Sequence, residues 1–247
     1  MKNLNRQTAQ AAKYPTKVIQ FGEGNFLRAF VDWIIWNTNK ATDFNAGVVV
    51  VQPIERGMVD MLNSQDGLYH VNLQGIDKGQ PVDSIEMIDV INGGLNPYTQ
   101  NAEFMALAED PNIRFVISNT TEAGIAFDPS CKLDDKPASS YPGKLTQLLY
   151  RRFQHFAGDK RIGGYVLWGE PNIFSPQTPG GVICYCIRRA IAQSYASAQG
   201  PPLKWSVAHI HTRSCKETIA RRIVLAYAHQ QCHFIFVCIS VFRKYAR

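Results

Sequence analysis

The sequence has no long apolar stretch and no apolar segment at its start. It holds no run of about 18 apolar residues, and residues 1–15 are mostly polar. A membrane-spanning helix needs the first feature, and a signal peptide needs the second. We therefore expect neither of them, and we expect the protein in the cytoplasm.

Aspartate is missing from the C-terminal part of the chain. Residues 160–247 contain no Asp and two Glu against 12 Lys and Arg, whereas residues 1–159 contain 18 acidic and 14 basic residues. The overall net charge of +6 therefore combines −4 in the first part with +10 in the second. The second part also holds five of the six cysteines and four of the six histidines. Such a step in composition predicts a boundary near residue 159.

A glycine turn near the start lacks the third glycine of the dinucleotide-binding pattern. Val18–Phe21 predicts a short buried strand, Gly22 and Gly24 follow it, and Leu27 stands where the third glycine would be. Apolar residues at helical spacing then predict a helix over about 26–37. Such a helix points free N–H groups and its positive dipole end into the turn, which is the outline of a pyrophosphate site. An ordinary turn is the alternative, and the residues alone leave both open.

A second predicted strand ends in polar residues. Val48–Val51 is a run of four β-branched residues, typical of a central parallel strand, and Gln52 stands at its end. In a NAD-binding fold an acid at this place usually holds the ribose hydroxyls. Here Glu55 and Arg56 come only slightly later, so the residues leave the choice between NAD and NADP open.

A third predicted strand, Arg114–Ser118, is followed by Asn119 and Thr120. In open α/β sheets, ligands bind beyond the carboxyl ends of the strands, where these two side chains are placed to contact the ribose or the nicotinamide. The alternative interpretation is a turn with a helix cap, which the same residue types favour.

The remaining patterns predict a β-hairpin and one long helix. Residues 67–74 and 84–90 alternate as strands do, and residues 77–79 supply a turn between them. Residues 141–156 predict a helix opened by a proline. We expect Arg151 and Arg152 to lie on its solvated face.

Several motifs carry a resemblance to a known family. Gln20–Phe30 resembles the N-terminal fingerprint of the long-chain mannitol dehydrogenase family, and Ser118–Gly124 is similar to that family's second Rossmann motif. Within the family, residues 48–55, 65–69 and 140–145 are most similar to a reductase of sugar acids. The likeness runs from about residue 1 to about residue 159.

The resemblance implies an α/β fold with a Rossmann-type, mostly parallel sheet over residues 1–159. It also implies NAD as the cofactor, a small-molecule sugar acid as the substrate, reversible hydride transfer between them, and no metal. The residues that it places at the cofactor are Phe21, Gly22, Gly24, Asn25, Phe26, Arg28, Gln52, Asn119 and Thr120.

The resemblance does not continue beyond Asp159. The family has a Pro-Cys-Glu-Leu-Ile-like segment there, then a helical domain with a catalytic Lys, and no position of this chain matches them. We therefore assign no catalytic residue and expect a truncated chain that binds NAD weakly or not at all and turns over substrate negligibly. The alternative function is a non-catalytic nucleotide-binding module with a basic interaction tail.

Residues 160–247 form an unmatched basic, Cys- and His-rich tail whose fold the sequence does not predict. Its composition favours an out-of-frame or otherwise aberrant translation. A metal-binding domain is a second interpretation, but the ligand spacing fits no compact zinc pattern; the candidate ligands are His209, His211, Cys215, His229, Cys232, His233 and Cys238. Nucleic-acid binding is a third, which we disfavour because the basic residues are scattered among apolar ones and form no stripe.

Overall fold

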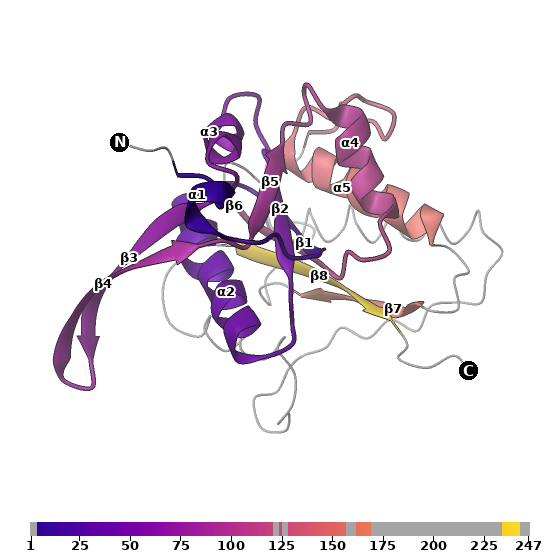
Figure 1. The fold of residues 1–247 in the computed structure, drawn as a ribbon. Helices are drawn as coiled ribbons and strands as arrows, with labels where there is room; N and C mark the ends of the chain where they lie inside the picture. Colours follow the sequence, from indigo (N-terminus) through magenta and orange to yellow (C-terminus); the bar gives the residue numbers. More distant parts are fainter. Residues whose placement is uncertain (1–3, 121–123, 125–127, 157–161, 169–233, 243–247) are drawn as a thin grey trace.

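A six-stranded sheet forms the centre of the computed structural model, which describes residues 4–120, 124, 128–156, 162–168 and 234–242. The strand order is β5-β2-β1-β6-β8-β7 (Figure 1). The first four strands in this order run parallel to one another: β5 (Ile91–Leu95), β2 (Gly47–Val51), β1 (Thr16–Phe21) and β6 (Phe115–Thr120). This confirms the predicted Rossmann-type, mostly parallel sheet.

The two remaining strands of the sheet come from beyond the predicted boundary near residue 159, and one of them, β8, runs antiparallel to its neighbours. β8 (Phe234–Phe242) pairs antiparallel with β6, and β7 (Ile162–Trp168) pairs antiparallel with β8. The candidate zinc ligands from His209 to His233 lie outside the described residues, so the interpretations of the tail stay predictions. Within the described ranges, no helix is long and apolar enough to cross a bilayer.

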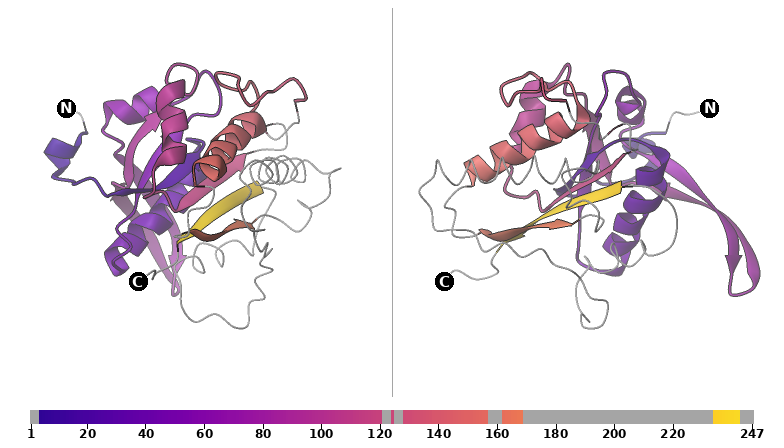
Figure 2. Two further views of the ribbon diagram at one scale, coloured as in Figure 1. Left: turned by 90° about the vertical axis from the view of Figure 1, so that its right-hand side faces the viewer. Right: turned by 180° about the vertical axis from the view of Figure 1, so that it is seen from behind.

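Helices cover both faces of the sheet. The helical segments are α1 (Arg6–Ala9), the π-helical turn η1 (Leu27–Val31), α2 (Asp32–Ala41), α3 (Val59–Ser64), α4 (Asn101–Ala106), the 3₁₀ turn η2 (Leu107–Glu109) and α5 (Tyr141–His155). α2 and α3 pack in one apolar cluster with β2, and α4 and α5 pack in another with the opposite face of β1 and β2 (Figure 2).

The order of connections places a topological switch at β1. The chain steps from β1 to β2 and on to β5, and then returns to the other side of β1 to form β6. The carboxyl ends of these parallel strands share one edge of the sheet, and ligands of open α/β sheets bind where the direction of winding reverses. The point between β1 and β6 is therefore where a cofactor is expected.

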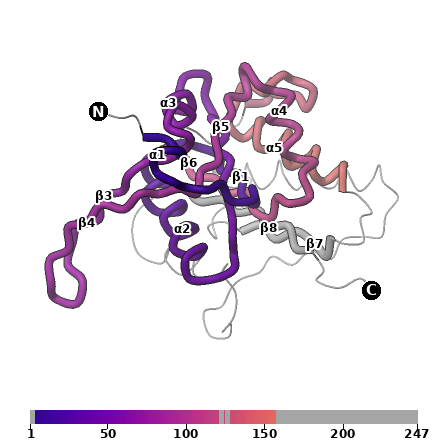
Figure 3. The backbone as a smooth tube through the Cα atoms, in the orientation of Figure 1, coloured from indigo at the N-terminus to yellow at the C-terminus, as the bar shows by residue number. Residues whose placement is uncertain are grey.

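The predicted hairpin is confirmed and projects away from the sheet (Figure 3). β3 (Tyr69–Asp77) and β4 (Gln80–Ile88) pair antiparallel over their whole length. The two residues between them, Lys78 and Gly79, both have positive φ, at 50° and 79°, as a two-residue hairpin turn requires.

The helix after the glycine turn differs from the regular α-helix that its spacing predicts. Its first part is the π-helical turn, in which the N–H of Asp32 donates to the carbonyl of Leu27, five residues earlier. The wider turn presents the carbonyl of Arg28, which accepts a hydrogen bond from the hydroxyl of Tyr69 at 2.8 Å. A π-turn of this kind is frequent at functional sites.

A buried carboxyl group lies directly below this turn. Asp32 is fully buried, and its Oδ2 lies 3.1 Å from the hydroxyl of Tyr69 and 3.4 Å from the side-chain amide of Gln20. Its other oxygen, Oδ1, has no hydrogen-bond partner in the described part of the chain. Burial raises the pKa of Asp32 to about 7, against the opposing effect of its two hydrogen bonds and of the charge on Arg28.

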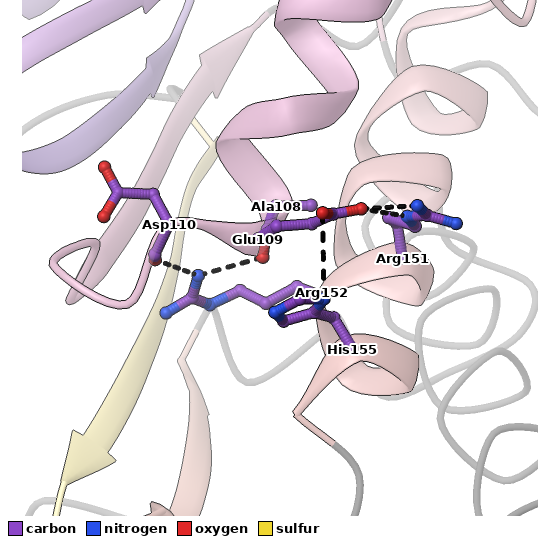
Figure 4. Close-up of polar contacts among 6 residues, drawn as sticks. All are labelled: Ala108, Glu109, Asp110, Arg151, Arg152 and His155. Atoms are coloured by element: carbon purple, nitrogen blue, oxygen red, sulfur yellow. Dashed lines mark hydrogen bonds and ion pairs between the residues drawn. The ribbon is translucent and has the colours of Figure 1, made fainter.

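The expectation that Arg152 lies on a solvated face is wrong. Its side chain is fully buried, and its guanidinium donates to three main-chain carbonyls that end the η2 turn and lead into β6, those of Ala108 (3.2 Å), Asp110 (3.0 Å) and Ile113 (2.5 Å). Figure 4 shows the first two of these bonds. Helical periodicity places this residue on the inner face of α5, beside the main-chain carbonyls of the connection before β6.

The neighbouring Arg151 lies outside, as expected. It forms an exposed ion pair and a hydrogen bond with Glu109, and His155 lies 3.8 Å from the same carboxylate (Figure 4). Adjacent arginines on one helix thus have opposite roles: Arg151 pairs at the surface, and Arg152 holds the chain that enters β6.

We predict that Arg152→Met lowers the free energy of unfolding by about 2–4 kcal/mol, because it removes three hydrogen bonds to main-chain carbonyls in a buried place. Arg151→Met is the matched control and should cost less than about 1 kcal/mol, since exposed ion pairs contribute little. Urea titration followed by circular dichroism measures both. Equal losses for the two variants would contradict the role given to Arg152.

We predict a pH-dependent stability difference between the unaltered chain and Asp32→Asn. The folded-state pKa of Asp32 lies above its ordinary value near 4, so stability is greatest at low pH and is lost as pH rises through the window from about 4 to about 7. Between pH 4.5 and 8 the variant should gain on the order of 3 kcal/mol relative to the unaltered chain. Urea titrations at both pH values measure this, and a difference that does not change with pH would contradict it.

Candidate functional site

The glycine turn lies at the switch point of the sheet. Phe21, the last residue of β1, pairs with Ser118 of β6 on one side and with Val51 of β2 on the other. A Cβ added to Gly22 would lie 3.6 Å from the carbonyl oxygen of Asn119. The turn and the end of β6, which come from distant parts of the sequence, are therefore direct neighbours.

Gly22 shapes the turn. Its φ is +112°, a conformation that other residues rarely adopt, and a Cβ there would approach Leu27 Cδ1 to 3.2 Å. Its N–H donates to the carbonyl of Val51 at 2.9 Å, and its own carbonyl accepts from Gln20 at 3.2 Å. The N–H of Gly22 is thus already used within the sheet and is not available to a phosphate.

The next two residues supply the available donors. Gly24 and Asn25 are exposed, and the helix begins with the bond from the N–H of Arg28 to the carbonyl of Gly24 at 3.2 Å. No acceptor for the N–H groups of Gly24 or Asn25 lies among the described residues. A Cβ at Gly24 would meet nothing within 4 Å, so an incoming group can approach this backbone closely.

Arg28 brings a positive charge to the same turn. Its Nε donates to the carbonyl of Glu23 at 2.9 Å, and its NH2 group donates to the side chain of Asn25 at 2.6 Å. Its guanidinium also lies over the ring of Tyr69, 5.6 Å from the centroid. The turn therefore combines free amides, a helix start and a fixed cation, which together suit an anion.

Two predicted cofactor residues have aromatic side chains that pack within the protein. Phe21 is fully buried, edge-to-face with the rings of Phe104 and Tyr141 at 5.9 and 6.0 Å. Phe26 is half-buried, 5.2 Å from the ring of Phe30. Packing accounts for both positions, and a cofactor contact by either stays a prediction.

The side chain of Gln52 is turned toward the loop that follows β2. Its amide donates to the carbonyls of Ile54 (2.9 Å) and Glu55 (3.0 Å), and its oxygen accepts from the N–H of Val59 at 3.2 Å. Gln52 thus holds the loop in place instead of pointing at the sheet edge. The exposed charged side chains at this strand end are those of Glu55 and Arg56, which follow on the loop.

Asn119 and Thr120 end β6 beside the turn, both half-buried. The hydroxyl of Ser118 just before them shares a short hydrogen bond with the hydroxyl of Tyr141, which also lies 3.4 Å from the carbonyl of Phe21. Burial raises the pKa of Tyr141. This hydroxyl pair joins the start of α5 to the ends of β1 and β6 and holds the predicted pair next to Gly22.

The sequence patterns did not single out Glu23, which lies between the two glycines. It is 7% exposed, and burial raises the pKa of its carboxyl group against the opposing effects of the Met58 N–H and of Arg28. The sequence shows only that an acid stands between two glycines. Its burial, which is rare for Glu, is known from the structure.

Lys144 in α5 is a buried lysine. Burial lowers the pKa of Lys144 to about 8, and its amine donates to the hydroxyl of Tyr98 (2.9 Å) and the carbonyl of Ser139 (2.8 Å). Both bonds tie α5 to neighbouring loops. Lys144 therefore has a structural role in the fold.

The chain resembles known proteins over this region. The family model described as the mannitol dehydrogenase Rossmann domain matches residues 16–167, which extends past the expected limit at 159 and includes most of β7. Altronate oxidoreductases from Bacteroides thetaiotaomicron and Phocaeicola vulgatus are each 73% identical over 163 residues, which cover 66% of this chain and 34% of each relative. The Escherichia coli protein of the same name is 50% identical over 168 residues, 68% of this chain and 35% of its own.

Solved structures agree on the fold. A D-sorbitol dehydrogenase in substrate-free form matches with a TM-score of 0.53 at 15% identity, covering 79% of this chain and 45% of the other. Mannitol 2-dehydrogenase of Pseudomonas fluorescens, in a ternary complex with NAD and D-mannitol, matches with a TM-score of 0.52 at 14% identity, covering 80% and 45%.

These findings confirm the resemblance drawn from the motifs. The sugar-acid reductase to which residues 48–55, 65–69 and 140–145 are most similar is tagaturonate reductase, another name for altronate oxidoreductase. The chain spans about a third of the length of the curated relatives that it matches. Since the family model covers more than half of its 247 residues, the chain belongs to the mannitol dehydrogenase family.

Proposed function

We propose that this chain supplies the dinucleotide-binding domain of an NAD-dependent oxidoreductase of the altronate oxidoreductase type. The reaction of the complete enzyme would be D-tagaturonate + NADH + H⁺ giving D-altronate + NAD⁺, and the reverse. One observation carries the proposal: the exposed amides of Gly24 and Asn25, which have no acceptor in the part of the chain that the structure describes, lie at the switch point of the sheet beside Arg28. The 73% identity to altronate oxidoreductases over this region supports the choice of substrate.

Residues at the ends of three strands, β1, β2 and β6, would each bind a different part of the cofactor. The amides of Gly24 and Asn25 would hold the pyrophosphate, with Arg28 as its counter-charge. Glu55, exposed beyond β2, would accept from the ribose hydroxyls in place of Gln52, whose amide is committed to the loop. Asn119 and Thr120 would lie toward the nicotinamide ribose. NAD itself would carry the hydride, so the domain contributes binding and orientation.

The chain would not complete a catalytic cycle. In the family that it resembles, the acid/base lysine belongs to a later domain, and no position of this chain matches it. The dinucleotide would also lack the contacts that a second domain supplies, which lowers its affinity.

We predict binding without turnover. NADH should bind the 247-residue chain with a Kd on the order of 0.1–1 mM, because no position of this chain matches the later domain of the family, which would supply further contacts. Titration calorimetry or ligand-observed NMR measures the affinity, and absorbance at the NADH band with tagaturonate measures turnover. NADH oxidation above the rate without protein would contradict the proposed incompleteness. No binding at about 10 mM NADH would contradict the cofactor assignment.

The charge of residues 160–247, +10, favours a second candidate function, a non-catalytic nucleotide-binding module with a basic interaction tail. Both candidates bind NADH without turnover. Retention on DNA that weakens steeply as salt rises would favour the module, because counterion release gives charged binding that dependence.

We predict that Gly24→Ala weakens NADH binding by about tenfold or more without loss of stability. A Cβ there meets no protein atom within 4 Å, but it occupies the space through which a phosphate reaches the amides. Gly75→Ala in the hairpin is the matched control, since its Cβ is equally unobstructed and remote from the turn, and it should change neither property. Unchanged NADH affinity in Gly24→Ala would contradict the assignment of the pyrophosphate site to this turn.

A further inference from the structure

Glu23 connects the glycine turn to the loop after β2. Although it stands between two glycines at the edge of the sheet, it is only 7% exposed. Its Oε1 accepts from the N–H of Met58 at 3.4 Å, 35 residues further along the chain. This is the contact by which the turn side chain reaches the loop that carries Glu55 and Arg56.

The loop backbone is pressed against this carboxylate. A Cβ on Gly57 would collide with Oε1 of Glu23 and would lie 2.6 Å from the side-chain amide of Gln52. Because φ of Gly57 is not positive, its lack of a side chain serves this close approach and not an unusual backbone conformation. The side chains of Glu23, after β1, and Gln52, after β2, thus both lie against the main chain at Gly57.

The other contacts of the loop come from its own side of the sheet. Gln52 binds the carbonyls of Ile54 and Glu55 and the N–H of Val59, and Asn96 donates to the carbonyl of Glu55 at 3.1 Å. Those bonds fix the loop to β2 and β5. Among the described contacts, only the Glu23 carboxylate joins the loop to the glycine turn.

Burial of an acid at this position has a cost. Desolvation raises the pKa of Glu23, and a weak 3.4 Å bond to Met58 compensates only in part. A glutamine of the same shape would make the contact without burying a charge. A buried ionisable group beside a binding site is a candidate for a functional role.

We propose that Glu23 is a positioning residue that sets the spacing between the two halves of the dinucleotide site, the amides of Gly24 and Asn25 on one side and the loop 54–58 on the other. The inference rests on the proposed function. Preorganisation of this kind favours a ligand that spans both halves and is of no benefit to a ligand that contacts one.

The test compares a spanning ligand with a half-site ligand. Glu23→Ala should weaken ADP-ribose, which reaches both halves, by about tenfold, and should leave adenosine, which reaches only the loop, within about twofold. Glu23→Gln should restore ADP-ribose affinity to within about twofold or threefold, because its side-chain oxygen still accepts from Met58. Asp60→Asn is the matched control; it removes an exposed acid two residues from Met58 and should change neither ligand.

A second readout needs no ligand. Hydrogen exchange of residues 56–60, measured by mass spectrometry on the full chain, should accelerate in Glu23→Ala and not in Asp60→Asn, since the Met58 N–H loses its acceptor. Gly57→Ala disturbs the same contact from the loop side and should reproduce the tenfold loss of ADP-ribose affinity, which covers the case in which Glu23→Ala does not fold.

The outcomes separate the inference from the proposed function. Unchanged ADP-ribose affinity in Glu23→Ala and Gly57→Ala overturns the inference, and so does an equal loss of ADP-ribose and adenosine binding, which a general structural defect would produce. Unchanged hydrogen exchange of residues 56–60 in Glu23→Ala would show that the Glu23 carboxylate does not hold this loop. Failure of the unaltered chain to bind ADP-ribose at all overturns the proposed function and, with it, the role of Glu23 at the cofactor.

Discussion

The parallel pairing of β1 between β2 and β6 is the constraint on which the rest of the site depends. It ends in one bond, from the N–H of Gly22 to the carbonyl of Val51 at 2.9 Å. That bond extends the ladder one residue past the strand and forces the chain to turn at a φ that glycine tolerates. Because the turn is fixed there, the exposed amides of Gly24 and Asn25, which have no acceptor among the described residues, occur at the start of a helix where the dipole favours an anion.

The support beneath the turn is polar, which is unusual for the inside of a sheet–helix layer. Gln20, Asp32 and Tyr69 are buried together there, and two of their oxygens, Gln20 Oε1 and Asp32 Oδ1, have no partner in the described part of the chain. A carboxyl group in such a place is stable mainly when protonated. The π-helical turn above it supplies the Arg28 carbonyl for Tyr69. The shape of the turn is therefore obtained at some expense of stability, as is common where binding sites are built.

Sequence patterns predicted the elements well because each reports a local property. Three of the four valines of β2 are buried, the alternation at 69–88 forms the hairpin, and the two glycines lie at the turn. The patterns failed where a side chain's partner is distant in sequence. Helical spacing puts Arg152 on the inner face of α5, but it does not show that the partners of Arg152 are carbonyls about 40 residues away, whereas Arg151 forms an exposed ion pair with Glu109.

At the candidate site, too, local sequence patterns did not give the contacts that depend on residues elsewhere in the fold. Gln52, at the end of β2, was predicted to contact the cofactor. Its amide donates to the carbonyls of the loop that follows, and a contact between Gln52 and the cofactor stays a prediction. Periodicity gives the position of a residue along a strand, and it does not give the direction in which a polar side chain at the strand end will turn. That direction depends on which main-chain groups of the next loop lack partners, and these are known only after the loop is folded.

Long-range electrostatics does not favour an anionic cofactor in this domain, so the site must work at short range. Residues 1–159 carry a net charge of −4, and a dinucleotide is itself negative. At physiological salt, charges further than about 8 Å from the phosphates are largely screened. What remains is local: two amides, a helix start and Arg28, whose guanidinium is held by the Glu23 carbonyl and the Asn25 side chain. Affinity at this edge therefore depends on the geometry of a few donors, and small displacements between the turn and the neighbouring loop matter more than the net charge of either.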